Sequence, residues 1–70
     1  MMTAYEISFF DAAGCKIASG PSEAQGDVRA VVAAIKLLDE RPECEAVEVS
    51  RAGRVLRRVA RSDLRAGRPA

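Results

Sequence analysis

Apolar and polar residues alternate near the start of the chain, which is the pattern of a strand with one buried face. The alternation covers residues 5–9 and returns in residues 15–19, after the loop sequence Asp-Ala-Ala-Gly at 11–14. Aspartate favours entry into a type I turn and glycine accepts a left-handed backbone, so we expect a three-residue hairpin loop with a bulge. Phe9 then lies opposite Ile17. The predicted core face holds Tyr5, Ile7, Phe9 and Ile17, with Phe10 and Lys16 on the other face.

The segment after this hairpin predicts the start of a helix. Gly20-Pro21 is expected to end the second strand. Ser22 could cap the helix, with a glutamine three residues later completing a capping box. Asp27 is an equally good cap, and residues 22–26 would then be a loose lead-in.

A helical pattern of apolar residues extends from residue 28 to residue 40. Pro42 prevents the helix from continuing and favours an extended backbone at the residue before it. We therefore expect one helix of about three turns between two hairpins.

A second hairpin follows the helix, with strands predicted at 44–50 and 54–61 and the loop Arg-Ala-Gly at 51–53. A three-residue loop, as in the first hairpin, pairs Val49 with Val55 and leaves Leu56 outside the core; Val59 joins the core side. A two-residue loop would instead turn Leu56 inward. We prefer the three-residue loop, although a single glycine fixes the register.

These elements predict an α+β fold of the order ββαββ. One four-stranded antiparallel sheet would be covered on one face by the helix. The strand order 2-1-3-4 makes every neighbouring pair antiparallel. Residues 1–61 would form the single domain, and residues 62–70, which show no periodicity, a flexible basic tail.

The predicted helix carries two apolar stripes, which is more than one sheet needs to cover it. At 100° per residue, the stripe suited to the sheet consists of Val28, Val31, Val32, Ile35 and Leu38. The flanking stripe consists of Ala30, Ala33, Ala34 and Leu37. The simpler interpretation is that the alanines serve only as good helix formers, which tolerate exposure to water. A chain of 70 residues has a small core, however, so we expect the flanking stripe to contact a second copy in a homodimer, or another partner. Pairing of exposed strand edges is a second route to a dimer.

Composition limits the chemistry that this chain can perform. It contains no histidine, the usual general base and metal ligand, and no phosphate-binding or nucleophile motif. Cys15 and Cys44 lie far apart and form no metal-binding pair, so we interpret them as reduced, semi-buried apolar side chains. We expect no catalytic residue, no metal ion, no cofactor and no enzymatic activity. The absence of a long apolar segment or a signal peptide predicts a cytoplasmic protein that does not enter a membrane.

Charge is segregated along the chain. Residues 1–50 carry a net charge of −5, and residues 51–70 carry a net charge of +6. Seven of the residues in 51–70 are arginines. Arginines in a strand and tail could bind nucleic-acid phosphates or an acidic partner. The candidate contacts are Arg54, Arg57, Arg58, Arg61 and Arg65.

Two observations weigh against nucleic acid. Only 4% of the residues are aromatic, and all three lie at positions 5–10, so few bases could stack. The arginines could also pair across the second hairpin with Glu43, Glu45 and Glu48, which we favour. Such exposed pairs contribute about 0–1 kcal/mol each.

Two segments of the chain carry recognisable motifs. The first is Tyr-x-Ile-x-Phe-Phe-Asp-x-x-Gly-x-x-Ile at 5–17, and the second is Val-Glu-Val-Ser-Arg-x-Gly-Arg at 47–54. Over residues 4–59 the chain resembles a group of small proteobacterial proteins with no established activity. Many of those chains have an aromatic residue where this one has Ser50. The resemblance implies a fold and no functional site.

The sequence thus predicts a small non-enzymatic protein–protein interaction module that forms a homodimer. The alternative is a nucleic-acid-associated protein that uses the arginine-rich last strand and tail.

Overall fold

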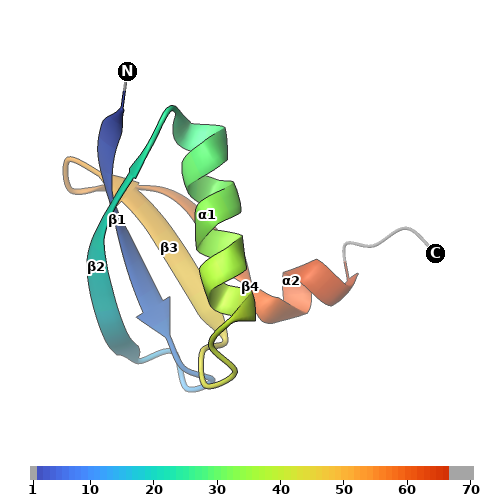
Figure 1. Cartoon of the computed structure of the whole chain (residues 1–70). Helices are drawn as coiled ribbons and strands as arrows, with labels where there is room; N and C mark the ends of the chain where they lie inside the picture. Colours follow the sequence, from blue (N-terminus) through green and yellow to red (C-terminus); the bar gives the residue numbers. More distant parts are fainter. Residues whose placement is uncertain (1, 67–70) are drawn as a thin grey trace.

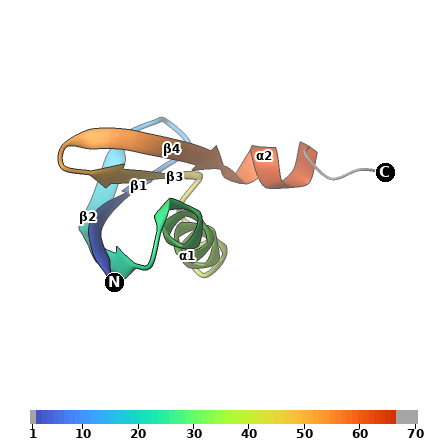
Figure 2. The ribbon, with the colours of Figure 1, turned by 90° about the horizontal axis from the view of Figure 1, so that it is seen from above.

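In the computed structural model, which describes residues 2–66 and the side chains of residues 2–64, one helix covers one face of a four-stranded antiparallel sheet (Figure 1 and Figure 2). The elements are β1 (Thr3–Phe10), β2 (Lys16–Ala24), α1 (Asp27–Asp39), β3 (Ala46–Arg51), β4 (Arg54–Ala60) and α2 (Arg61–Ala66). The strands are ordered β2-β1-β3-β4. The predicted ββαββ order and the predicted strand order are both confirmed.

The core lies between α1 and the sheet. Its largest fully buried side chains are Ile7, Leu38, Val47, Val49 and Cys44. The predicted alternation of β1 and β3 is therefore confirmed, because Ile7 comes from β1, and Val47 and Val49 come from β3.

The loop of the first hairpin forms as predicted, around the side chain of Asp11. Its carboxylate accepts hydrogen bonds from the backbone N–H of Ala13 (3.0 Å) and of Cys15 (2.9 Å). Gly14 has φ +85°, which a side chain would disfavour. The aspartate and the glycine together fix the loop.

The register changes one residue beyond this loop. Phe10 pairs with Lys16 as predicted, but Phe9 pairs with Ala18, so Ile17 occupies a bulge. Ile17 is 44% exposed, and its predicted place in the core is wrong. The bulge turns Ala18 toward the core in its place.

β2 continues through Gly20 and Pro21, where the sequence predicted its end. Pro21 pairs with Glu6 on an edge strand, where a residue without an N–H is tolerated. Ser22 pairs with Tyr5, so it does not cap the helix. The residue before α1 is Gly26, which has no side chain with which to cap the helix, and Asp27 is the first helical residue. Both predicted caps are therefore wrong.

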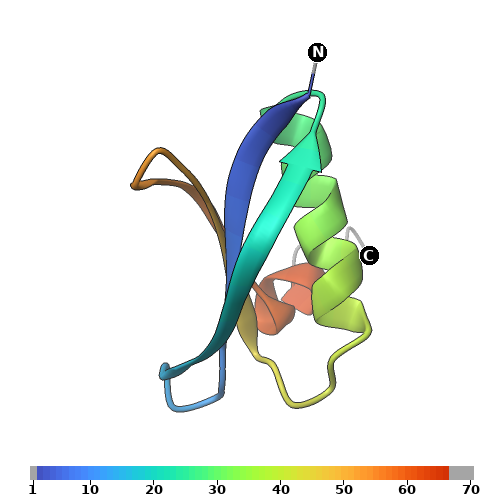
Figure 3. The same cartoon turned by 60° about the vertical axis from the view of Figure 1, so that its left-hand side comes forward.

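The second hairpin turns on two residues, not the preferred three. Ala52 and Gly53 have φ of 54° and 79°, the signs of a type I′ turn. In a three-residue loop the place of Asp11 would fall to Ser50, whose hydroxyl instead donates a hydrogen bond to the carbonyl oxygen of Glu6 at 3.4 Å. Ser50 thus does not hold the second loop as Asp11 holds the first, despite their shared Ala-Gly ending. The turn curls away from α1 (Figure 3).

The two-residue turn settles the register of β4. Ser50 pairs with Val55 and Val49 pairs with Arg57, so Leu56 occupies a bulge and packs against the core. Val55 is 54% exposed, and its predicted pairing with Val49 is wrong. The alternative in which Leu56 turns inward is confirmed, as is the burial of Val59.

The chain after β4 is more regular than expected. Residues 61–66 form α2, which extends from the end of β4 (Figure 2), where the sequence predicted a tail without regular structure. Asp63 accepts a hydrogen bond from the N–H of Ala60 at 3.1 Å, which stabilises the start of α2. Residues 67–70 of the predicted tail lie outside the described residues.

Ala52 offers a test of the turn. A side chain other than glycine or asparagine disfavours a left-handed backbone, so Ala52→Asn should raise the free energy of unfolding by about 0.5–1 kcal/mol. Urea denaturation would measure the change. The matched control is Ala12→Asn, in the loop of the first hairpin, for which we expect a change within about 0.5 kcal/mol. An equal gain in both variants would argue against the type I′ turn.

Candidate interaction surface

The face of α1 that meets the sheet is the alanine side of the helix. Ala30, Ala34 and Leu38 are the buried residues of α1, each with 0% exposure. Of the stripe that the sequence assigned to the sheet, Leu38 alone is fully buried, whereas Val28 and Val32 are 77% and 45% exposed. The predicted orientation of the helix is therefore wrong in part: the buried face is centred on Ala30, Ala34 and Leu38, and Val31 and Ile35 of the predicted stripe pack beside it.

Small side chains explain part of this orientation, because alanine lets the helix backbone approach the strands more closely than valine would. A polar contact at the start of α1 explains more of it. Asp27 accepts a hydrogen bond from the Tyr5 hydroxyl at 2.7 Å, and Arg51 Nη1 lies 3.1 Å from the same carboxylate oxygen. Asp27 projects from the same side of the helix as Ala34 and Leu38. The contact thus holds the alanine side toward the sheet.

The predicted contact residues of α1 divide between core and surface. Ala30 and Ala34 lie in the core and are not accessible to a second copy, which corrects their assignment as contact residues. Ala33 is half-buried. Leu37 packs against the core and lines a hollow of about 220 Å³ beside β2.

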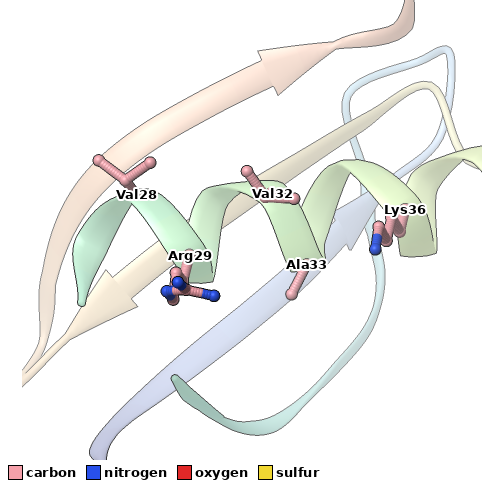
Figure 4. A pocket seen from close by; sticks show the side chains of 5 residues that line it. All are labelled: Val28, Arg29, Val32, Ala33 and Lys36. Carbon is pink, nitrogen blue, oxygen red and sulfur yellow. The ribbon is translucent and has the colours of Figure 1, made fainter. Parts of the chain in front are cut away.

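The exposed apolar surface of α1 is centred on Val28 and Val32. Both residues line two adjoining hollows, which we call together the valine patch. The first, of about 470 Å³, is completed by Arg29, Ala33 and Lys36 (Figure 4). The second, of about 410 Å³, lies between α1 and β4 and is completed by Asp27, Val31, Leu56 and Arg57.

Cationic side chains are among those that line the two hollows of the valine patch. Val28 and Val32 point to one side of α1, and Arg29 points to the other (Figure 4). Arg57 lines the hollow on the β4 side. The acidic residue of that hollow, Asp27, is already bonded to Tyr5 and Arg51. An apolar centre with a basic rim is the anatomy of a protein contact surface.

Arg58 lies on the sheet face opposite α1, in a contact that the sequence predicted in part. Its Nη1 lies 2.9 Å from a carboxylate oxygen of Glu48, its cross-strand partner, and its guanidinium carbon lies over the ring of Phe10, 4.7 Å from the ring centroid. The predicted pairing of arginines with glutamates across the second hairpin is confirmed at this position.

Arg61 serves the fold. Its guanidinium donates hydrogen bonds to the carbonyl oxygens of Leu38 (2.7 Å), Arg41 (2.8 Å) and Cys44 (3.0 Å). The last carbonyls of a helix have no partner within it, so Arg61 closes the C-terminal end of α1 and the loop that follows. A guanidinium held in this way is not offered to a phosphate or an acidic partner.

Three of the five candidate arginines are exposed on β4, and since Arg58 is paired with Glu48, Arg54 and Arg57 remain as candidate contacts. The side chain of Arg65 lies outside the described residues. Sequence reasoning missed Arg51, which the structure brings to Asp27 from 24 residues away. It also missed the exposed valines, because a helical wheel shows apolar stripes without showing which of them meets the sheet.

The two cysteines lie in different environments. Cys44 is buried and Cys15 is exposed, so the prediction of two semi-buried thiols describes neither. Burial raises the pKa of the Cys44 thiol, which therefore stays protonated near neutral pH. Among the described residues, no three histidine, cysteine or carboxylate side chains gather as a metal site would require. No helix in the described part of the chain is long and apolar enough to span a membrane.

Comparison with known proteins adds no assignment: no family model, curated protein or solved structure matches this chain. The resemblance found in the sequence stays a prediction.

Arg61→Ala should destabilise the protein by about 2–3 kcal/mol, because three backbone carbonyls, two of them in part-buried contacts, lose a charged donor. Arg61→Lys should recover only part of this loss, since an ammonium group lacks the planar fork. Urea denaturation measures both, with Arg54→Ala as the matched control, expected to change stability by less than about 0.5 kcal/mol. Equal effects at the two positions would show that general charge, not the carbonyl contacts, sets the stability.

We expect the hydroxyl of Tyr5 to ionise at a higher pH than that of an ordinary tyrosine, and its ionisation to lower the free energy of unfolding. The hydrogen bond to the Asp27 carboxylate, followed by burial and the charge of Asp27, raises the pKa of Tyr5 above its ordinary value of 10.0, because these contacts favour the protonated phenol. Its stabilising contribution is complete below the ordinary pKa and is lost as the pH rises through the raised one. The stability difference between the wild type and Tyr5→Phe should therefore shrink at alkaline pH.

Tyr5 is the single tyrosine of the chain, so phenolate absorbance reports its ionisation directly. Urea denaturation of both proteins across the same pH range would measure the coupling. Titration at the ordinary value, or a stability difference that does not change with pH, would contradict the contact with Asp27.

Proposed function

We propose that this chain is a non-enzymatic protein–protein interaction module whose contact surface is the valine patch. The observation that carries the proposal is the pair Val28 and Val32, which are 77% and 45% exposed and adjoin two hollows. A residue such as Val28 gains no stability for the fold from this position, whereas burial against a partner would contribute about 25 cal/mol per Å² of apolar surface.

The homodimer remains a proposal of its own. Because Ala30 and Ala34 are inside the core, a second copy would have to meet the valine patch or a strand edge. A second copy that covered Val28 and Val32 would extend the small core of this short chain, which supports the expectation.

The nucleic-acid alternative has less support than the sequence suggested. Arg58 pairs with Glu48, and Arg61 binds backbone carbonyls, which leaves Arg54 and Arg57 as exposed arginines of β4. A basic surface of this size binds phosphates weakly unless other residues add to it. An electrophoretic shift assay at low salt would detect such binding.

Peptide selection tests the proposed function. Random peptides displayed on phage would be selected on the wild-type protein, and the recovered peptides would be measured on Val32→Ser and on Ile17→Ser. Ile17 is the matched control, because its exposure of 44% is nearly that of Val32 but it lies on β2. We expect peptides that bind Val32→Ser about tenfold more weakly than the wild type, a loss of about 1.4 kcal/mol.

Peptides that bind Ile17→Ser as weakly as Val32→Ser, or a selection that yields no peptide sensitive to Val32, would contradict the proposal. Sedimentation equilibrium of the same three proteins tests the homodimer separately. A wild-type dimer that Val32→Ser dissociates would assign the valine patch to a second copy.

A further inference from the structure

β4 lies at the end of the sheet and presents backbone groups to whatever lies beside it. The N–H of Arg61 donates to the carbonyl of Glu45 at 2.7 Å, which fixes the alternation of the ladder between β3 and β4. In an antiparallel pair the groups of alternate residues face away, so those of Arg58 and Ala60 point out from the sheet. The N–H of Ala60 already binds the carboxylate of Asp63 at 3.1 Å, so of these two residues Arg58 is the one whose N–H can pair with an added strand.

The opposite edge is less suited to pairing. β2 carries Gly20 and Pro21 in its middle, and proline has no N–H to donate. β4 contains neither proline nor glycine over its length, Arg54–Ala60. A strand added at β4 would therefore meet no residue without an N–H, whereas a strand added at β2 would meet Pro21.

The hollow between α1 and β4 lies on the face that such a strand would extend. Alternate side chains of an added strand would point toward this face. The hollow, of about 410 Å³, offers them the apolar side chains of Val28, Val32 and Leu56 together with the guanidinium of Arg57. An aliphatic side chain fits the first three, and a carboxylate fits the fourth.

Charge decides between possible occupants of this edge. β4 contains Arg54, Arg57 and Arg58 and no acidic residue. A second copy of β4 paired antiparallel to the first would bring arginines against arginines, which disfavours a homodimer at this edge. The acidic side chain nearest the hollow, Asp27, is bonded to Tyr5 and Arg51 and does not offset Arg57. The occupant must bring carboxylates of its own.

We propose that the edge of β4 binds an extended acidic segment of a partner protein, which adds to the sheet as a further strand. The inference rests on the proposed interaction function and names the partner's chemistry. Backbone hydrogen bonds to Arg58 hold the segment, one aliphatic side chain enters the hollow beside Val28 and Val32, and carboxylates pair with Arg57 and Arg54. The same arginines that repel a second copy select this partner.

The probe is a fluorescent synthetic peptide of about eight residues that interleaves valine and glutamate. A lysine version of the same peptide tests charge, and a version with alternate backbone amides N-methylated tests strand pairing. We expect the glutamate peptide to bind, and both other versions to bind at least tenfold more weakly. On peptide binding, the amide of Arg58 should become protected from hydrogen exchange in NMR spectra.

Arg57→Glu should weaken binding of the glutamate peptide about tenfold or more, because it replaces attraction by repulsion. Arg57→Gln should weaken it less. The matched control is Lys16→Glu, the same change of charge at the far edge of the sheet, which should leave binding unchanged. Arg57 and Lys16 are both exposed, and circular dichroism would confirm that each variant is folded.

Several results would overturn the inference. Equal binding of the N-methylated peptide would exclude strand addition, and equal weakening by Lys16→Glu would show general charge attraction. Displacement of the peptide by a single-stranded oligonucleotide that binds wild type but not Arg57→Glu would assign the edge to nucleic acid. If selected peptides are sensitive to Val32→Ser but the glutamate peptide does not bind, the inference is wrong and the proposed function stands. If no selected peptide is sensitive to Val32→Ser and the glutamate peptide does not bind, both the inference and the proposed function are wrong.

Discussion

Polar contacts with the rest of the chain hold α1 at both of its ends, and these contacts determine how the helix is rotated about its axis. At the first turn, Asp27 binds the hydroxyl of Tyr5 and the guanidinium of Arg51. At the last turn, Arg61 binds the carbonyl of Leu38. Tyr5, Arg51 and Arg61 come from three different segments of the chain, so the helix cannot turn without breaking contacts to all of them.

This rotation decides which apolar residues form the core and which stay exposed. With Ala30 and Ala34 against the sheet, the helix approaches the strands closely, and the larger valines at 28 and 32 are left on the outer side. A helix rotated so that Val28 and Val32 met the sheet would separate Asp27 from Tyr5. The exposed valines are thus a consequence of the polar contacts at the helix ends, and they lie beside the open edge of β4 because Leu56 and Arg57 complete the same hollow.

The order of strands and helix could be predicted from the sequence, because alternation and turn residues are local signals. The alternating β1, the helix up to residue 39 and the valines of β3 follow from such signals. The registers of the hairpins depended on details beyond the shared Ala-Gly ending. Asp11 accepts hydrogen bonds from two backbone N–H groups of its loop, whereas Ser50, which would take that place in a three-residue second loop, donates to the carbonyl of Glu6. The first loop has three residues and the second has two.

The rotation of α1 could not be predicted in the same way. A helical wheel showed two apolar stripes, and the choice between them depends on partners 22 and 24 residues from Asp27. No periodicity contains that information, because it is a property of where the hairpins place Tyr5 and Arg51. Two of the residues predicted to contact a partner, Ala30 and Ala34, therefore lie in the core, and the exposed valines of α1 are Val28 and Val32.

The arginines of residues 51–70 show why charge segregation in a sequence does not by itself describe a basic surface. Arg51 pairs with Asp27, Arg58 pairs with Glu48, and Arg61 closes the end of α1, so three of them stabilise the fold. Arg54 and Arg57 stay exposed on a strand whose other edge is paired. Arg57 lines the apolar hollow, and a charge at a fixed position beside apolar side chains discriminates between partners by position, which a wide basic surface cannot do. Because Arg51, Arg58 and Arg61 are used within the fold, the proposed selectivity of this edge rests on Arg57 and Arg54.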